Sequence, residues 1–125
     1  MHGIVALLSR ARLSTETEKR LQADMAERFA AAGLVFEREV VVDGGVIDFL
    51  ITAPGGRLAS GESPGEIGIE VKIGGTAKDA RRQLERYAEE PRIASFVLVT
   101  AKPLLMPSLI GGKRVAFVFL GRAWL

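Results

Sequence analysis

The chain has 125 residues, 48% of them hydrophobic and 26% charged, which is typical of one globular domain rather than of a disordered protein. The chain has a net charge of +2 and a pI near 9.3, which are compatible with a polyanionic partner but do not require one. Without cysteine, and with His2 as its one histidine, the sequence excludes disulfides, thiolate zinc sites and multi-histidine centres, so any metal is expected to have oxygen ligands.

The first third of the chain is expected to be helical. Residues 3–13 carry apolar side chains at a weak helical spacing and form an N-terminal extension that packs on the domain or on a second copy of it. A longer helix follows, with Ser14 or Thr15 as its cap and Glu18 at the capping-box position three residues after Thr15. Gly33 is expected to end this helix. Its inward-facing side chains are Leu21, Met25, Phe29 and Ala32.

The rest of the chain reads as strands around one further helix. In chain order we expect strands at 35–42 and 46–53 joined by a turn at 43–45, a loop at 54–65, a strand at 66–73, a helix at 76–90 stopped by Pro91, and strands at 94–100 and 115–120. The last two strands are almost wholly apolar, which favours the centre of the sheet. The order predicts a single α/β domain over residues 1–125, with a mixed central sheet flanked by helices.

No apolar run reaches the roughly 18 residues that a membrane-spanning helix needs. The stretch 3–8 is also too short for the core of a signal peptide. We therefore expect a cytoplasmic protein without a membrane partner, or one of the host cytoplasm if its source is viral.

Three polar residues interrupt two otherwise apolar strands. Because side chains alternate along a strand, Glu70 and Lys72 project from one face of strand 66–73 while Val71 belongs to the other, apolar face. Asp48 stands in the middle of strand 46–53, where it should share a face with Val46 and Leu50. The opposite face is then formed by Ile47, Phe49 and Ile51. A carboxylate in so apolar a strand normally has a cation, either a basic side chain or a metal, beside it.

If the two strands are neighbours, the two acids can converge on one divalent cation. A cation held in this way stabilises negative charge that develops on a phosphate and activates a water molecule. Lys72 can orient or deprotonate that water and offset charge in the transition state. The residues thus predict Asp48, Glu70 and Lys72 as a catalytic centre for phosphodiester cleavage.

This pattern resembles the PD-(D/E)xK nuclease superfamily. The matching segments are Val46-Ile47-Asp48-Phe49 and Ile69-Glu70-Val71-Lys72-Ile73, although Ile47 stands where that family often has proline. The element order also matches, so the resemblance covers nearly the whole chain and implies a restriction-endonuclease-like αβββαβ core. It further implies that Asp48, Glu70 and the backbone carbonyl of Val71 bind Mg²⁺ or Mn²⁺, with Lys72 assisting catalysis.

Further residues extend the resemblance. Gln83 and Tyr87 match the Gln-x-x-x-Tyr motif of the RecB-like branch, and their spacing of four places them on one helical face. The family often carries a metal-binding glutamate on its first helix. Glu18 is the candidate here, because it points inward and Glu16 does not. The alternative role of Glu18 is that of the capping-box residue. Basic residues on the second long helix are interpreted as contacts to the phosphate backbone or, alternatively, as partners of Asp79 and Glu85. These are Lys78, Arg81, Arg82 and Arg86.

The expected function is that of a Mg²⁺- or Mn²⁺-dependent deoxyribonuclease that recognises DNA structure or ends rather than sequence. Two forms compete: a RecB-like end-processing module, and a homodimeric junction-resolvase-like endonuclease, either within a larger replication, recombination or repair assembly. A nuclease-fold protein that binds nucleic acid or joins an assembly without cutting is the alternative. An unrelated α/β interaction module, in which the three polar residues form a structural ion network, is the third interpretation.

Overall fold

A computed structural model describes residues 2–52 and 65–120, so the predictions for 53–64 lie outside the described residues. The chain is an α/β protein with a six-stranded mixed, open sheet and three helices. No helix in the described part combines the length and the apolar character that a membrane crossing requires. The elements are α1 (His2–Arg10), α2 (Glu18–Ala31), β1 (Phe36–Val42), β2 (Gly45–Thr52), β3 (Glu66–Lys72), α3 (Ala77–Tyr87), β4 (Ile93–Thr100), β5 (Leu109–Ile110) and β6 (Lys113–Phe119).

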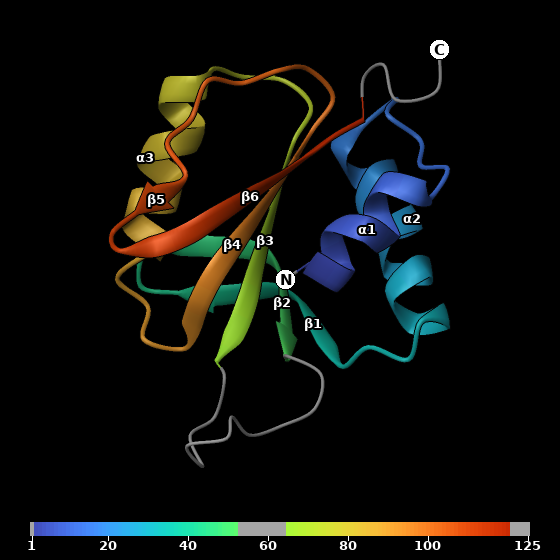
Figure 1. Ribbon diagram of the computed structural model, residues 1–125, viewed down its shortest axis with the longest axis horizontal. Coiled ribbons are helices and arrows are strands. Elements are labelled where there is room, and N and C mark those ends of the chain that lie inside the picture. The colour runs from blue at the N-terminus through green and yellow to red at the C-terminus, as the bar shows by residue number, and fades with distance from the viewer. Residues whose placement is uncertain (1, 53–64, 121–125) are drawn as a thin grey trace.

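The strands lie in the order β1-β2-β3-β4-β6-β5 (Figure 1). Strands β1, β2 and β3 form an antiparallel meander, whereas β4 runs parallel to both β3 and β6. A parallel neighbour needs a crossover connection, and α3 supplies it between β3 and β4. The predicted order of helix, three strands, helix and two strands is confirmed, with the two-residue strand β5 as an addition.

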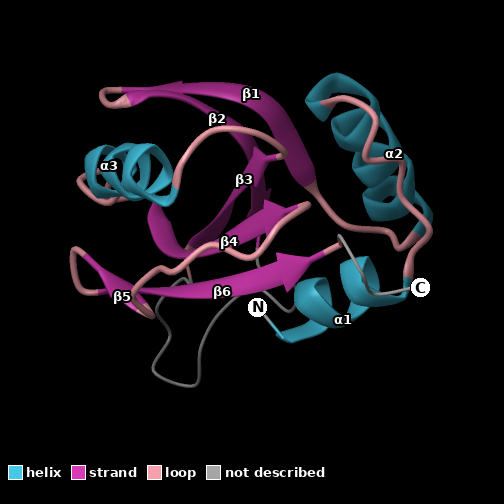
Figure 2. Cartoon of the chain, turned by 90° about the horizontal axis from the view of Figure 1, so that it is seen from above, coloured by secondary structure: helices cyan, strands magenta, loops and turns pink. Residues whose placement is uncertain are grey.

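The sheet separates two apolar cores, and each is closed by different helices. In Figure 2, α1 and α2 lie on one side of the sheet and α3 lies on the other. The core under α1 and α2 contains Leu8, Leu21 and Phe29 against side chains of the sheet such as Ile69. Leu84 and Tyr87 of α3 pack in the second core. Because α1 buries Ile4 and Leu8 in the first core, it packs on its own domain.

Helix α2 begins three residues later than a cap at Ser14 would require. Thr17 is the N-cap, and its side-chain oxygen accepts a hydrogen bond from the Arg20 backbone N–H at 3.0 Å. The predicted cap at Ser14 or Thr15 is wrong, because the Ser14 N–H donates to the Asp24 carboxylate at 2.8 Å and holds this segment outside the helix. Gly33, with φ of +74°, follows the helix as predicted.

Two further boundaries differ from the prediction. Helix α3 ends at Tyr87 with Ala88 as its C-cap, before residues 89 and 90, so Pro91 does not stop it. Strand β4 is central and almost fully buried, as predicted, but β6 is not. Only the short β5 lies beyond β6, and Phe117 and Phe119 are each 37% exposed.

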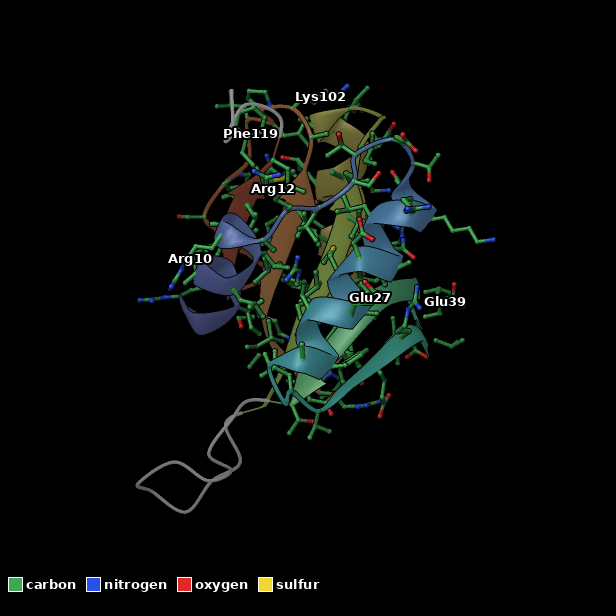
Figure 3. All side chains as sticks on the ribbon, turned by 90° about the vertical axis from the view of Figure 1, so that its right-hand side faces the viewer. Arg10, Arg12, Glu27, Glu39, Lys102 and Phe119 are labelled. Atoms are coloured by element: carbon green, nitrogen blue, oxygen red, sulfur yellow. The ribbon has the colours of Figure 1, made fainter. Side chains whose placement is uncertain are left out.

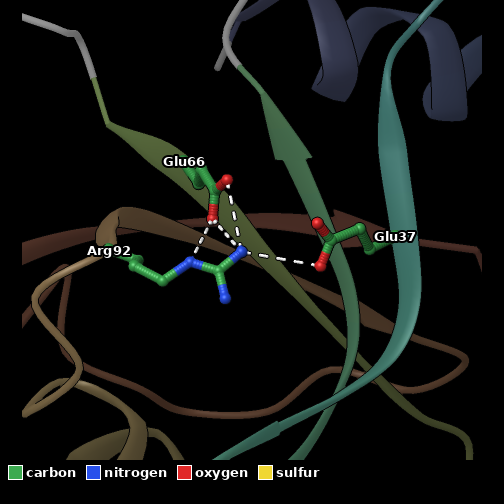
Figure 4. A network of polar contacts seen from close by, with 3 residues as sticks. All are labelled: Glu37, Glu66 and Arg92. Carbon is green, nitrogen blue, oxygen red and sulfur yellow. Dashed lines mark hydrogen bonds and ion pairs between the residues drawn. The ribbon is translucent and has the colours of Figure 1, made fainter.

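An arginine joins the strands at the end of the sheet where β3 begins. Arg92, at the entry to β4, contacts Glu66 at 3.0 Å and Glu37 of β1 at 3.5 Å (Figure 4). Its Nε also donates to Glu66 at 3.1 Å. One cation thus links the first strand of the meander to the third, at the end of β3 remote from Glu70 and Lys72.

Candidate functional site

Asp48 lies at a kink in the β1–β2 hairpin. The register pairs Arg38 with Phe49 and Val40 with Ile47, and the position between these pairs, where Glu39 faces Asp48, drops out of the ladder. Glu39 has φ of +51° and is the one non-glycine residue with positive φ in the described ranges. This backbone conformation is rare for L-residues and ends the regular alternation of side chains.

The kink contradicts one prediction about β2. Ile47 was expected to share a face with Phe49, but it packs with Leu50 in the core under α3, whereas Phe49 packs in the core under α2. Alternation therefore changes phase at Asp48. This residue belongs to neither face and its side chain turns along the sheet toward β3.

Beyond the end of the β2–β3 ladder, the carboxylate of Asp48 links the two strands by a hydrogen bond. The last pair of that ladder is Phe49 with Ile69. Beyond it, the backbone N–H of Val71 donates to Asp48 Oδ2 at 2.8 Å, and the N–H of Asp48 donates to Glu70 Oε1 at 3.4 Å. Side chains thus satisfy backbone groups that would otherwise be left unpaired in a buried position.

The carboxyl groups of Asp48 and Glu70 are in direct contact. Glu70 is 2% exposed, and burial raises its pKa to about 9, with the negative charge of Asp48 adding to the effect. Burial also raises the pKa of Asp48, and a hydrogen bond from the Glu70 carboxyl opposes this. With its pKa raised to about 9, Glu70 is therefore protonated at neutral pH. Two desolvated carboxyl groups in contact are a strong site for a cation.

Lys72 projects beside this pair, as the alternation in β3 predicts. Val71 is buried in the core under α1 and α2, which leaves Glu70 and Lys72 on the face toward α3. The positive charge of Lys72 lowers the pKa of both acids. Within the described ranges Lys72 nevertheless has no carboxylate within 4 Å, so the three residues do not form a closed ion network.

Glu18 reaches the same region from the start of α2. Because Thr17 is the cap, Glu18 is the first residue of the helix and has no capping-box role. Its Oε1 instead accepts a hydrogen bond from the backbone N–H of Ile73 at 3.1 Å, just past the end of β3. Its charge raises the pKa of Asp48. The structure therefore removes the rival explanation for Glu18 and places it near enough to act on Asp48 by its charge, but not close enough to form a three-acid cluster with the pair.

Gln83 and Tyr87 meet on one face of α3, as their spacing predicts. Gln83 Nε2 donates to the Tyr87 hydroxyl at 2.7 Å, and that hydroxyl donates to the carbonyl of Val46 at 2.7 Å. Burial and the nearby charge of Glu70 raise the pKa of Tyr87 to about 12. The pair ties α3 to β2 two residues before Asp48, and its influence on the acids is electrostatic rather than through a hydrogen bond.

The four basic residues predicted to contact phosphates, Lys78, Arg81, Arg82 and Arg86, are all exposed on α3. Within the described part of the chain, neither Asp79 nor Glu85 forms an ion pair with any of them. The alternative of a helix laced with internal charge pairs is therefore wrong. Arg86 donates to the carbonyl of Gly44 at 3.3 Å, which ties α3 to the hairpin turn.

The oxygen atoms available to a metal are those of the acid pair. The residues that the structure describes contain no cluster of three or more Asp, Glu, His or Cys close enough to hold an ion. The hard carboxylate oxygens of Asp48 and Glu70 suit Mg²⁺ or Mn²⁺, which bind through one or two carboxylates and keep several waters. The donor chemistry fits such an ion, with Glu18 and the Val71 carbonyl as the predicted additional ligands.

Two residues that shape the site were not identified from the sequence. Gly68 lies under Ile47, and a Cβ placed there would lie 2.6 Å from Ile47 Cδ1. A glycine inside a strand is itself a signal of such a close approach, so it could have been found. The left-handed conformation of Glu39 had no signal, because glutamate has no preference for it.

Comparison of the chain with protein-family models, with curated proteins and with solved structures finds no match.

Proposed function

We propose that the chain is a metal-dependent nucleic-acid phosphodiesterase of the PD-(D/E)xK type, with a restriction-endonuclease-like core. The observation that carries the proposal is the contact between Asp48 and Glu70 at the point where β2 separates from β3. Two carboxyl groups in contact in a desolvated place are destabilising unless a proton or a cation lies between them. Lys72 beside them completes the set that phosphodiester cleavage needs.

Asp48 and Glu70 would hold the metal, with Glu18 and the Val71 carbonyl as further ligands. Bound Mg²⁺ or Mn²⁺ would offset negative charge on the phosphate and lower the pKa of a water molecule. Lys72 would orient the attacking water and stabilise the charge that develops on the phosphate oxygens. Gln83 and Tyr87 hold α3, the helix that carries the basic side chains, against β2.

The substrate that we propose is DNA. The support is the exposed row of four basic residues on α3, the helix that begins four residues beyond Ile73. The row has no acidic partners on the helix in the described part of the chain. Such a row neutralises phosphates without reading bases, so it favours recognition of DNA ends or shape over sequence. A dimeric endonuclease and an end-processing module remain the two forms of this proposal, in recombination or repair.

The decisive test is cleavage with Mg²⁺ or Mn²⁺ on linear, branched and single-stranded DNA. Asp48→Asn and Lys72→Ala should each lower the rate by at least about 100-fold, since each removes a group that acts on the phosphate or water. Asp79→Asn is the matched control, an exposed acid on α3 that makes no ion pair with any residue the structure describes, and it should cut at the wild-type rate. Equal activity in all four proteins would refute the assignment.

A second candidate is a protein with the same architecture that binds nucleic acid without cutting. It is favoured by the fact that both acids already accept backbone N–H groups, which gives them a structural role. Retained DNA binding with no cleavage under either metal would support it. Loss of DNA binding in a variant with Lys78, Arg81 and Arg82 changed to Ala would then place the interface on α3.

A further inference from the structure

The kink at Asp48 lies opposite a residue of β1 with an unusual backbone conformation. On both strands of the hairpin the phase of side-chain alternation changes at the same level. Arg38 lies over the Phe49 ring on the α2 side, with its guanidinium carbon 5.6 Å from the ring centroid, whereas Val40 packs with Ile47 in the core under α3. Between them stands Glu39 with its φ of +51°. A regular hairpin has no reason to switch faces on both strands together.

The side chain of Glu39 does not explain its position. It is exposed, lies on the outer strand in Figure 3, and makes no hydrogen bond or ion pair with other described residues. The left-handed region disfavours residues with a side chain, so the surrounding fold must hold Glu39 there. What Glu39 contributes to the molecule is therefore its backbone conformation.

On β3, Gly68 leaves space for the kink because it has no side chain. Ile47, fully buried after the change of phase, occupies the space above Gly68, where an added Cβ would also lie 3.3 Å from Phe96. Gly68 is two residues before Glu70 on the same face of β3. The shifted position of Ile47 and the site for Glu70 are thus built into the same stretch of strand.

We propose that Glu39 is a positioning residue whose left-handed backbone directs the Asp48 carboxylate to Glu70 and the Val71 N–H. With extended backbone at Glu39 the ladder would continue through the Glu39–Asp48 pair. Asp48 would then share a face with Leu50, as regular alternation requires, and would no longer point along the sheet to β3. Its relevance to catalysis rests on the proposed function, but the geometry stands without it.

The test is a series of substitutions at Glu39, compared by Mn²⁺ affinity and by the amide exchange and chemical shift of Val71. Glu39→Gly and Glu39→Asn accept positive φ and should retain both properties, whereas Glu39→Val resists it. In Glu39→Val we expect Mn²⁺ affinity to fall by about 10- to 100-fold, the usual effect of misplacing a metal ligand. The Val71 amide should then exchange as fast as in Asp48→Asn.

Arg38→Val is the matched control, because it puts valine at the preceding exposed position, where φ is not positive. It should leave Mn²⁺ affinity and the Val71 amide unchanged. If Glu39→Val does not fold, Glu39→Ala decides the matter, since alanine tolerates positive φ less well than glycine and should bind Mn²⁺ more weakly than Glu39→Gly. The proposal would be overturned if Glu39→Val or Glu39→Ala matched Glu39→Gly in Mn²⁺ affinity and Val71 amide exchange. It would also be overturned if the Val71 amide exchanged fast in Glu39→Gly.

The outcome is separable from that of the proposed function. Neither readout uses DNA, and the Val71 amide does not require a metal. A wild-type protein that cuts no DNA would defeat the nuclease assignment and leave the dependence of Val71 on residue 39 to be measured. DNA cleavage by the wild type, together with a Val71 amide that does not respond to substitutions at residue 39, would support the nuclease assignment and overturn the role of Glu39.

Discussion

Replacing Glu70 by glutamine should stabilise the metal-free protein at neutral pH, although Glu70 is proposed to be essential for activity. The folded chain keeps this carboxyl protonated, with a pKa of about 9, whereas the unfolded chain ionises it with an ordinary pKa of 4.5. Each pH unit above 4.5 costs the folded state about 1.4 kcal/mol. At pH 7 the cost is therefore about 3 kcal/mol, and glutamine, which mimics the protonated acid, avoids it.

The sign of the pH dependence follows from the direction of the pKa shift. Because the pKa of Glu70 is raised in the folded state, its contribution is fully favourable below pH 4.5 and is lost as the pH rises toward 9. Wild type and Glu70→Gln should have nearly equal free energies of unfolding at pH 4 and differ increasingly at higher pH. At pH 7 we expect the variant to melt roughly 10 °C higher, at a few degrees per kcal/mol for a chain of this size.

The assay is thermal and urea unfolding of both proteins between pH 4 and 9, with EDTA and then with Mn²⁺. A bound cation should stabilise the wild type and reverse the order of the two proteins, because glutamine is a poor ligand. Glu89→Gln, an exposed acid with no ion pair in the described residues, is the control and should change neither curve. A Glu70→Gln protein that is less stable than wild type at pH 7, or a difference independent of pH, would refute the reasoning.

Three other substitutions probe the scaffold. Tyr87→Phe removes the hydroxyl that bonds the Val46 carbonyl at 2.7 Å and should cost about 1–2 kcal/mol in urea unfolding, with unchanged stability as the contrary result. Gly68→Ala brings a methyl group within 2.6 Å of the buried Ile47 Cδ1 and should lower the free energy of unfolding by about 1–3 kcal/mol; a neutral effect would show that Ile47 moves freely. Arg92→Ala should cost only about 0.5 kcal/mol, because this side chain is 46% exposed, and the loss should vanish in 1 M NaCl.

Much of the fold and part of the site can be predicted from the sequence, where local pattern decides structure. Strand β3 pairs regularly from Ile67 to Lys72, so alternation correctly placed Glu70 and Lys72 opposite Val71. The helical spacing of Gln83 and Tyr87 likewise predicted their contact. Both cases depend only on the period of one element, which tertiary packing left unchanged.

The predictions failed where a distant residue decides. Ser14, Thr15 and Thr17 are all good helix caps, and the choice among them was made by Asp24, which holds the Ser14 N–H ten residues away. The kink at Asp48 depends on a φ angle in the strand opposite, at Glu39, and no pattern within β2 contains it.

Sheet order also depends on contacts that no single strand encodes. The apolar sequence of β6 suggested a central strand, yet one of its sides meets only the two residues of β5. Its exposed Phe117 and Phe119 show that an apolar strand is not always a covered one. Here composition was a weaker guide than the number of neighbours a strand acquires.

The ladder between β2 and β3 ends before it reaches the site. All four of its residue pairs lie between Phe49 and Thr52, on the side that Arg92 fastens. Past Phe49 the two strands are joined by the hydrogen bonds that Asp48 makes, at 2.8 and 3.4 Å. The two strands are therefore joined by a backbone ladder at one end and by side-chain hydrogen bonds at the other. An ion bound between the acids would therefore replace hydrogen bonds made by side chains and would break no pair of the β2–β3 ladder.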